Sequence, residues 1–297
     1  MNFLVIANRF AGNVGMGWKL PGPSPARRIE DALRRLGAKA EIYLSADEEE
    51  ATRLARQASH SSYDAVVAAG GDGTISSVVN GLVGGEVPLG LIPIGTENVL
   101  ARDMGIPLSI AQACRRLVKT RPRVVDVGRL GDRFFLCFAG IGFDAQVVRE
   151  VPLDLKGAMG SLAYVVTALR TAPRYLEVER RARLVVDGQA VEHEFWLIVI
   201  GNIASYGGKL KLTPRASPQD GLLDVCVFRR VDVPGLLMQV GGVVTGTHVD
   251  LDEVAYYQAR SLEVHSEPPA PVQVDGDPFG TTPCLVQVVP AALKVKF

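Results

Sequence analysis

Two short glycine-containing segments have the composition of phosphate-binding turns. Gly70-Gly71-Asp72-Gly73-Thr74 follows the apolar run Asp64–Ala69, and Gly95-Thr96-Glu97-Asn98 follows the run Leu89–Ile94. A nucleotide's phosphates need backbone N–H donors at close range, and glycine has no Cβ to obstruct that approach. A strand that ends in two glycines and leads into a helix directs these donors and the helix N-terminus at an anion. We expect Thr74 to cap that helix.

Asp72 is an unexpected residue in such a loop, because a carboxylate repels phosphate. It makes sense through a cation or a hydroxyl that it holds, which suggests Mg²⁺. The competing interpretation is a plain strand–turn–helix connection, which is less favoured because a second such turn would lie beside the first at one sheet edge. Neither loop follows the pattern Gly-x-x-x-x-Gly-Lys or Gly-x-Gly-x-x-Gly.

Two aspartate-containing turns are candidates for acid–base or metal chemistry. Asp275 and Asp277 flank Gly276, and residues two apart in an extended segment face the same side. Two carboxylates on one side raise each other's pKa or share a metal, whereas the alternative is a solvated turn. Asp220-Gly221 can hold a hard cation through oxygen, or it is an ordinary β-turn.

The elements that must position these residues fall into two groups. Up to Pro122, apolar strands alternate with helices that begin near Ser24-Pro25, Asp47 and Thr74; the strands are Phe3–Ala7, Lys39–Leu44, Asp64–Ala69 and Leu89–Ile94. This order predicts a parallel sheet covered by helices on both faces, with ligands at the carboxyl ends of its strands.

After Pro122 the pattern changes to alternating strands separated by Gly, Pro and Asp turns, with one helix over Ser161–Arg170. The predicted strands are Arg123–Leu130, Arg133–Ala139, Leu176–Val186, Val191–Ile200, Leu222–Phe228, Ser261–His265, Val272–Asp275 and Leu285–Val289. They predict an antiparallel, sandwich-like second domain. We therefore expect domains at residues 1–122 and 123–297, and leave open whether the last strand returns to the first domain. Glu267–Pro271 is interpreted as a surface linker.

Composition excludes several classes of protein. Of 297 residues, 47% are hydrophobic, and 32 Lys+Arg balance 32 Asp+Glu. The chain therefore lacks the excess of basic residues that would indicate nucleic-acid binding. The four cysteines show no CxxC spacing, as expected of buried thiols in a reducing compartment. No apolar run reaches the roughly 18–20 residues of a membrane span, and the N-terminus is interpreted as a strand, so we expect a cytoplasmic protein.

Five motifs in order resemble the diacylglycerol kinase catalytic domain family, which includes bacterial soluble diacylglycerol kinases and YegS-type lipid kinases and is related to sphingosine and ceramide kinases. The motifs span nearly the whole chain, and they are Val66–Gly81, Pro88–Pro107, Gly140–Ala145, Gly207–Val225 and Val274–Pro278. The resemblance implies an N-terminal Rossmann-like nucleotide domain of the NAD kinase and phosphofructokinase type and a C-terminal β-sandwich-like domain for lipid and Mg²⁺, with the active site in the cleft.

The implied activity is transfer of the γ-phosphoryl group of ATP to the hydroxyl of a lipid such as diacylglycerol. The enzyme would use ATP and Mg²⁺ and would visit the membrane surface from the cytoplasm. The implied nucleotide contacts are Asn8, Ser45, Gly70, Gly71, Asp72, Gly73, Thr74, Gly95, Thr96 and Asn98, to which the place of Arg9 at a strand end adds that residue. The implied metal ligands are Ser217, Asp220 and Leu222. The implied catalytic residues are Asp277, Asp275 and Asp72, and either Asp277 or Asp275 is the general base.

Three positions depart from the family pattern. Arg9 stands for the usual proline, Val99 for an aspartate, and Asp277 for a glutamate one methylene longer. Two alternatives to a lipid kinase stay open: another GGDGT-type small-molecule kinase such as an NAD kinase, and a non-catalytic nucleotide-binding regulatory protein. The lipid and a homodimeric state also stay open. Apolar segments at 158–166 and 236–244 would border an acyl-chain pocket or be ordinary core helices.

Overall fold

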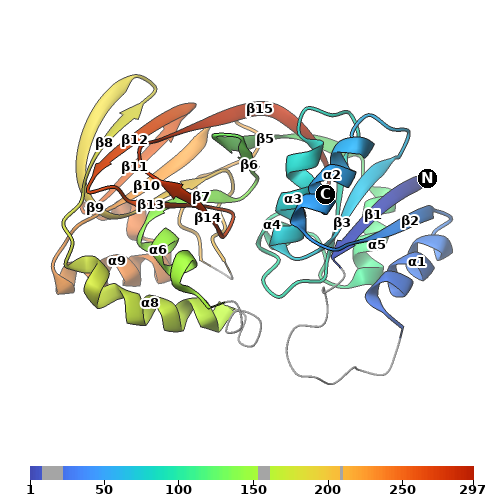
Figure 1. The fold of residues 1–297 in the computed structure, drawn as a ribbon, viewed down its shortest axis with the longest axis horizontal. Helices are drawn as coiled ribbons and strands as arrows, with labels where there is room; N and C mark the ends of the chain where they lie inside the picture. Colours follow the sequence, from blue (N-terminus) through green and yellow to red (C-terminus); the bar gives the residue numbers. More distant parts are fainter. Residues whose placement is uncertain (9–22, 153–160, 208–209) are drawn as a thin grey trace. The chain divides into compact units, whose positions relative to one another are not determined.

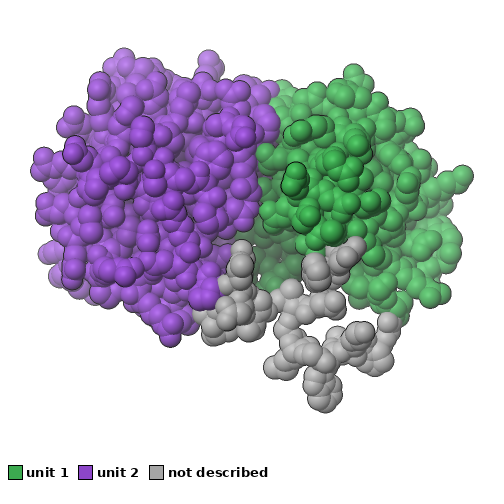
Figure 2. All heavy atoms as spheres, viewed as in Figure 1, with its two compact units in different colours: residues 1–125, 291–297 green, residues 126–290 purple. Residues whose placement is uncertain are grey.

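The computed structural model of the chain describes residues 1–8, 23–152, 161–207 and 210–297. The chain divides into two compact units, shown in different colours in Figure 2. Unit 1 comprises Met1–Val125 together with Ala291–Phe297, and unit 2 comprises Asp126–Pro290.

Unit 1 is a parallel α/β structure in which four strands lie in the order β4-β3-β1-β2 (Figure 1). Its elements are β1 (Asn2–Asn8), α1 (Pro25–Arg35), β2 (Lys39–Ser45), α2 (Glu48–Ala58), β3 (Ala65–Gly70), α3 (Asp72–Leu82), β4 (Leu89–Pro93), α4 (Val99–Asp103) and α5 (Ile110–Lys119). The interior of β1 and all of β3 are buried, as expected of strands covered on both faces. α1 packs with α5, and α2 packs with α3.

The helix starts of unit 1 follow the capping signals of the sequence. The Ser24 hydroxyl accepts the N–H of Arg27, with Pro25 at the first helical position, and the Asp47 carboxylate accepts the N–H of Glu50. Both predicted caps are confirmed. These helices return the chain so that all four strands run in one direction and end at one edge of the sheet.

Unit 2 is largely antiparallel. Its elements are most of β5 (Pro122–Leu130), β6 (Arg133–Phe135), β7 (Phe138–Gly142), α6 (Phe143–Glu150), α8 (Ser161–Leu176), β8 (Arg181–Val186), β9 (Gln189–Gly201), β10 (Leu223–Arg229), α9 (Val233–Thr245), η1 (His248–Asp250), β11 (Val254–Ala259), β12 (Ser261–Glu267), β13 (Pro271–Val274), β14 (Asp277–Thr281) and the first part of β15 (Cys284–Lys296). The long strand β9 pairs with β8 along its first half and with β7 and β10 along its second. The apolar core lies between these strands.

The predicted fold class is confirmed, but three local predictions are wrong. The strand predicted over Leu176–Val186 begins only at Arg181, because α8 continues through Pro173 to Leu176 and buries Tyr175 against the ring of Phe143. The strand predicted over Arg133–Ala139 divides into β6 and β7. The predicted linker Glu267–Pro271 is partly core, since Ala270 is fully buried.

Cys114, Cys137 and Cys226 are buried and Cys284 is half-buried, and all four are free thiols. Burial raises the pKa of Cys114 to about 11 and that of Cys284 to about 12, so these thiols are unreactive at neutral pH. None of the helices in the described parts of the chain combines the length and apolar character that crossing a membrane requires.

Candidate active site

The carboxyl edge of the parallel sheet in unit 1 gathers most of the predicted nucleotide residues. Asn8 ends β1 and lies in register with Ser45 at the end of β2. Gly70 ends β3 and lies in register with Pro93, just before the second glycine turn. Arg9, also predicted to contact the nucleotide, lies outside the described residues.

The two glycine turns pack main chain against main chain. The N–H of Ile94 donates to the carbonyl of Gly70 at 3.0 Å. A Cβ added to Gly95 would lie 2.4 Å from the Cα of Gly71, a distance that real Cβ atoms do not adopt. Glycine at Gly95 is therefore required by this close approach, and the two turns form one joined structure.

Asn98 holds the second turn from within. Its backbone is left-handed, with φ of 51°, and its side chain is buried. The side-chain oxygen accepts the N–H of Gly95 at 3.1 Å, and the amide nitrogen donates to the carbonyl of Gly95 at 2.7 Å. Asn98 thus shapes the turn, while Thr96 is exposed and accessible to a ligand.

Asp72 has partners that the sequence did not indicate. Its carboxylate lies at the N-terminus of α4, where it accepts the N–H of Leu100 at 3.4 Å. Burial raises the pKa of the Asp72 carboxyl, and hydrogen bonds from the N–H groups of Val99, Leu100 and Asn98 act in the opposite direction. The carboxylate therefore links the first glycine turn to the helix that follows the second, in addition to any cation that it meets.

The N-terminus of α3 carries no side-chain cap. The helix begins at Asp72 with Gly71 as its N-cap residue, so Thr74 lies inside the first turn and is buried. The expectation that Thr74 caps the helix is wrong, because the helix starts two residues earlier. An uncapped first turn leaves main-chain N–H groups for an anion.

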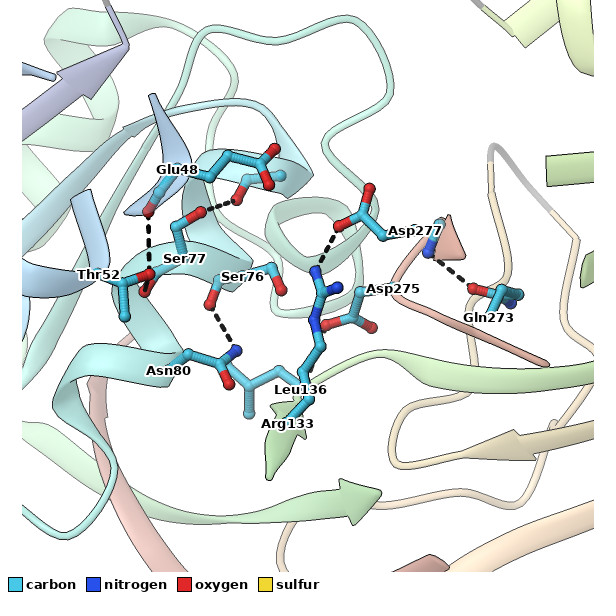
Figure 3. A network of polar contacts seen from close by, with 12 residues as sticks. Glu48, Thr52, Ser76, Ser77, Asn80, Arg133, Leu136, Gln273, Asp275 and Asp277 are labelled. Carbon is cyan, nitrogen blue, oxygen red and sulfur yellow. Dashed lines mark hydrogen bonds and ion pairs between the residues drawn. The ribbon is translucent and has the colours of Figure 1, made fainter. Parts of the chain in front are cut away.

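Contacts with α2 fix the position of α3. The Thr52 hydroxyl of α2 donates to the carbonyl of Ser77 in α3 at 3.0 Å (Figure 3). Glu48, at the start of α2, approaches the first turn of α3 so closely that its Oε1 would lie 3.3 Å from a Cβ at Gly73. Sequence reasoning missed Glu48, because only the packing of the two helices brings it to this point.

In unit 2, the hairpin of β13 and β14 carries the paired aspartates. Val274 and Asp277 are in register, so Asp275 and Gly276 form the two-residue turn, both with positive φ, 48° and 87°. The Asp275 carboxylate accepts the N–H groups of Cys137 and Phe138 at 3.2 and 3.0 Å. Asp275 therefore fastens the turn to the segment that leads into β7.

Asp277 is directed elsewhere. Its Oδ2 forms an ion pair with the Arg133 guanidinium, and both side chains are about one quarter exposed (27% and 26%). Figure 3 shows Asp277 turned toward Arg133 and Asp275 toward the main chain at Leu136. The expectation that the two carboxylates face the same side of an extended strand is wrong, because the residues between Val274 and Asp277 turn. Arg133 was not singled out from the sequence.

The predicted metal ligands Ser217, Asp220 and Leu222 share one turn of unit 2. Asp220 is exposed, and its Oδ1 accepts the N–H of Leu222 at 3.0 Å. A buried aspartate, Asp126, accepts the N–H of Gly221 at 2.8 Å, and its own N–H donates to the carbonyl of Pro218. Sequence reasoning missed Asp126, although a carboxylate within an apolar strand was a usable signal.

The donors at this turn fit a hard cation, since one carboxylate and two main-chain carbonyls supply the oxygen atoms that Mg²⁺ prefers. A further carboxyl group, that of Asp224, lies near Asp220: burial raises its pKa, hydrogen bonds from Tyr256 and Gln258 lower it, and the charge of Asp220 raises it. Among the described residues, no group of three or more His, Cys, Asp or Glu side chains could hold a metal ion.

Segment 236–244, predicted to border an acyl-chain pocket or to form an ordinary core helix, lies in α9 and is not a core helix. In α9, Gln239 is buried, whereas Leu237, Met238 and Val244 are 67%, 59% and 71% exposed. Residues 158–160 of the other segment lie outside the described residues.

Comparison with known proteins agrees with this arrangement. Residues 2–130 match the diacylglycerol kinase catalytic domain, and residues 138–297 match the YegS C-terminal NAD kinase beta sandwich-like domain. The diacylglycerol kinase of Bacillus subtilis (strain 168) is 31% identical over 239 residues, which cover 79% of this chain and 78% of that protein.

Solved structures extend the likeness to the whole fold. A crystal structure of a putative diacylglycerol kinase from Bacillus anthracis strain Sterne matches with a TM-score of 0.82 at 24% identity, covering 100% of this chain and 95% of that one. An NAD kinase from Archaeoglobus fulgidus in complex with ATP matches with a TM-score of 0.52 at 14% identity, covering 100% and 94%. The family resemblance predicted from the motifs is confirmed: this chain belongs to the diacylglycerol kinase family, in the form that joins the catalytic domain to a YegS C-terminal domain.

Proposed function

We propose that this chain transfers the γ-phosphoryl group of ATP to the hydroxyl of a lipid, diacylglycerol or a related lipid alcohol. The observation that carries the proposal is the uncapped N-terminus of α3, which begins in the first glycine turn, where the second glycine turn packs against it main chain to main chain. In a member of this family, such a set of free N–H donors suits a nucleotide triphosphate. Residues 1–122 would bind ATP, and residues 123–297 would bind the lipid and Mg²⁺.

The nucleotide phosphates would contact the main chain of Gly70–Thr74 and the turn at Gly95-Thr96. Asn8 and Ser45 stand at the same sheet edge and would contact the rest of the nucleotide. Asn98 would act through the turn that it shapes, rather than by touching the nucleotide with its side-chain amide.

Asp277 would be the general base. Arg133 holds Oδ2 and so orients the carboxylate, which leaves Oδ1 to accept the proton of the lipid hydroxyl. The lipid oxygen then forms a bond to the γ-phosphorus as the bond between that phosphorus and the β–γ bridging oxygen breaks, and ADP leaves. Asp275 would contribute indirectly, because its carboxylate is occupied by main-chain N–H groups.

Mg²⁺, when bound, would neutralise charge on the nucleotide phosphates or on the acidic turn of unit 2. Ser217 and Leu222 would hold it through carbonyl oxygens and Asp220 through its carboxylate. Asp72 remains a candidate for a catalytic contact through a cation.

We further propose that the protein works in the cytoplasm and visits the membrane surface to reach its lipid. The four free thiols are consistent with a reducing compartment. The exposed apolar side of α9 supports contact with lipid, because apolar side chains in water favour transfer to an apolar phase.

The test is transfer of radiolabelled γ-phosphate to a panel of lipids with a free hydroxyl. We expect a labelled lipid product from the native protein, and a fall in kcat of about 10²–10⁴-fold in Asp277→Asn. Asp275→Asn is the matched control. It should lower the melting temperature, but its kcat, measured at a temperature where the variant is folded, should change much less than that of Asp277→Asn. If only Asp275→Asn abolishes transfer, the two roles are exchanged.

A non-catalytic nucleotide-binding protein is the second candidate. The side chain of Val99, which replaces a family aspartate, is buried, so the missing carboxylate has been replaced by core packing. Intact ATP binding without any labelled lipid, across the whole panel, would favour this second function.

A further inference from the structure

The side-chain amide of Gln273, in β13, is occupied at both ends. Gln273 is 1% exposed. Its Oε1 accepts the N–H of Gly276, in the hairpin turn, at 2.8 Å, and its Nε2 donates to Oδ2 of Asp144 at 2.9 Å. Gln273 therefore connects the turn before Asp277 to a carboxylate in the interior of unit 2.

Asp144 is a buried carboxylate that receives three donors. Oδ1 accepts the N–H of Ala145 at 2.7 Å, and Oδ2 accepts the hydroxyl of Tyr206 at 2.9 Å in addition to the amide of Gln273. Burial raises the pKa of this carboxyl, whereas the three donors favour its charged form. A buried charge is expensive to maintain when packing alone is required, since an apolar residue of similar size would avoid the cost.

The backbone next to the pair leaves room for this contact. A Cβ added to Gly140, in β7, would lie 1.8 Å from Oδ2 of Asp144 and 2.6 Å from Nε2 of Gln273. Any side chain at this position would displace one partner. The pair is thus accommodated by three separate elements, β7, α6 and β13.

The chemistry of the pair gives the amide a direction. A glutamine amide has a donor end and an acceptor end, which are nearly equal in shape. An ionised carboxylate accepts hydrogen bonds and donates none, so Asp144 attracts Nε2 and leaves Oε1 to receive the N–H of Gly276. Asp144 therefore determines how the turn is held, although it does not touch the turn itself.

We propose that Asp144 and Gln273 are positioning residues for phosphoryl transfer, which hold the Asp275–Gly276 turn and thereby aim the carboxylate of Asp277. The proposal rests on the proposed function of Asp277 as general base. A displacement of about 1 Å at a reacting group can cost about 10²-fold in rate.

The test exchanges the chemical identities of the two side chains. Gln273→Glu alone places two carboxylates face to face. Asp144→Asn alone introduces an NH₂ group, which meets either the NH₂ group of Gln273 or the N–H of Ala145, whichever way the new amide turns. Each single variant therefore contains one repulsive contact.

The double variant restores the lost contacts. The asparagine introduced at position 144 donates one N–H to the glutamate introduced at position 273 and the other to the hydroxyl oxygen of Tyr206, while its oxygen accepts the N–H of Ala145. The introduced glutamate still accepts the N–H of Gly276. The direction of hydrogen bonding is reversed between the pair and toward Tyr206, but the hairpin turn is held as in the native protein.

We expect each single variant to lower kcat by about 10–100-fold with little change in the KM for ATP, and the double variant to recover to within about threefold of the native value. Hydrogen exchange of the Gly276 amide provides a readout that does not need activity. Exchange should be fast in both single variants and slow again in the double variant.

Two results would overturn the proposal. One is native kcat in a folded single variant whose Gly276 amide exchanges rapidly. The other is a double variant that restores slow exchange but no activity. Failure of the proposed function is distinguishable, because then either the native protein would label no lipid or Asp277→Asn would retain full activity, while the exchange pattern of Gly276 would remain as expected.

Discussion

Asp275 and Asp277 are two residues apart, yet the structure gives their carboxylates different surroundings. Asp275 accepts main-chain N–H groups from residues 137 and 138, whereas Asp277 faces the guanidinium of Arg133. A carboxylate already filled by N–H donors is poorly placed to accept a further proton. The local contacts therefore favour Asp277 as the base, a choice that the sequence left open.

At the residue scale, the sequence identified many of the candidate site residues, but it did not predict the contacts that those residues make. The aspartate pair, the glycine turns and the acidic turn at Asp220 were all visible as patterns. Arg133 and Gln273 were not, because the importance of each depends on a partner far along the chain: Asp277 lies 144 positions from Arg133, and Asp144 lies 129 positions from Gln273. No local spacing encodes such contacts, and one chain without its relatives does not reveal them.

The carboxylate of Asp72 has two candidate roles, a hydrogen bond to the main chain and the binding of a cation, and two substitutions can separate them. Asp72→Ala removes the acceptor for the N–H of Leu100 and the charge, and we expect it to abolish turnover. Asp72→Asn keeps an oxygen that can accept this N–H, so its melting temperature should stay near the native value. If the charge also holds a cation, kcat of Asp72→Asn should nevertheless fall by at least about 10²-fold.

The measurement is kcat together with thermal unfolding for both variants. Near-native turnover in Asp72→Asn would show that the carboxylate serves only to link the first turn to α4. Near-native turnover in Asp72→Ala would show that the assignment of this loop to phosphate binding is wrong.

At the element scale, the phosphate-binding edge consists of two turns that depend on each other. Gly95 lies against Gly71 so closely that only one of the two positions has any room for a methyl group: a Cβ at Gly71 would lie 3.3 Å from the Cα of Gly95. The turns are also tied by the hydrogen bond from Ile94 to Gly70 and by Asp72 at the start of α4. A substitution in one turn should therefore alter the conformation of the other.

Gly95→Ala and Gly71→Ala form a matched pair that tests this dependence. The methyl group added by Gly95→Ala would overlap the main chain of the first turn, so we expect a loss of about 1–3 kcal/mol in the free energy of unfolding and markedly weaker ATP binding. Gly71→Ala should be milder in both respects, since a shift of a few tenths of an ångström relieves its contact. Urea unfolding and ATP titration measure the two effects, and equal effects of the two substitutions would contradict the joined-turn arrangement.

Secondary structure was predicted well where periodicity and capping agree, as in α1 and α2, and poorly where tertiary packing overrides a local signal. Pro173 suggests a helix end, but α8 continues because Tyr175 packs on Phe143 and beneath the guanidinium of Arg180. The pattern at 267–271 suggests a linker, yet the N–H of Ala270 bonds to the hydroxyl of Thr282 and its methyl group is buried. Neither Phe143 nor Thr282 is near its partner in sequence.

At the scale of the whole molecule, the two units divide the proposed reaction between them. In that proposal, unit 1 would supply main-chain N–H groups at the end of a parallel sheet, and unit 2 would supply the carboxylate of Asp277 on a hairpin. The chain crosses between the units twice, in β5 and in β15, whose last residues pair with β4. Composition and motif order predicted two domains, but only the pairing of Val295 with Leu89 places the C-terminus in unit 1.

In one helix of unit 2, a polar side chain is buried and several apolar side chains are exposed, which is the reverse of the usual arrangement. In α9, which runs along one side of the unit 2 strands (Figure 1), Gln239 is 1% exposed and bonds to Trp196 and to the carbonyls of Arg229 and Glu253. Five apolar side chains of α9 are exposed instead, and the helix contains no charged residue; the five are Val233, Leu237, Met238, Val240 and Val244. Five exposed side chains on one short helix form a small apolar surface compared with the roughly 800 Å² that each partner of a stable protein complex buries. The limited area and the lack of charge suit shallow insertion into a lipid surface.

We therefore expect α9 to contact the membrane when the enzyme reaches its substrate. Leu237→Glu and Val244→Glu should reduce sedimentation with vesicles of neutral phosphatidylcholine that contain diacylglycerol, and should raise the KM for vesicle-borne lipid by at least about tenfold, because a charge must be removed from water to insert. Leu108→Glu is the control, since Leu108 is a similarly apolar side chain, 42% exposed, in unit 1. The KM for ATP and the activity on a short-chain, water-soluble lipid should stay unchanged in all three variants. Unaltered vesicle binding in Leu237→Glu would contradict this role, and so would conversion of a native dimer to a monomer, which would assign the apolar side of α9 to a second copy of the chain.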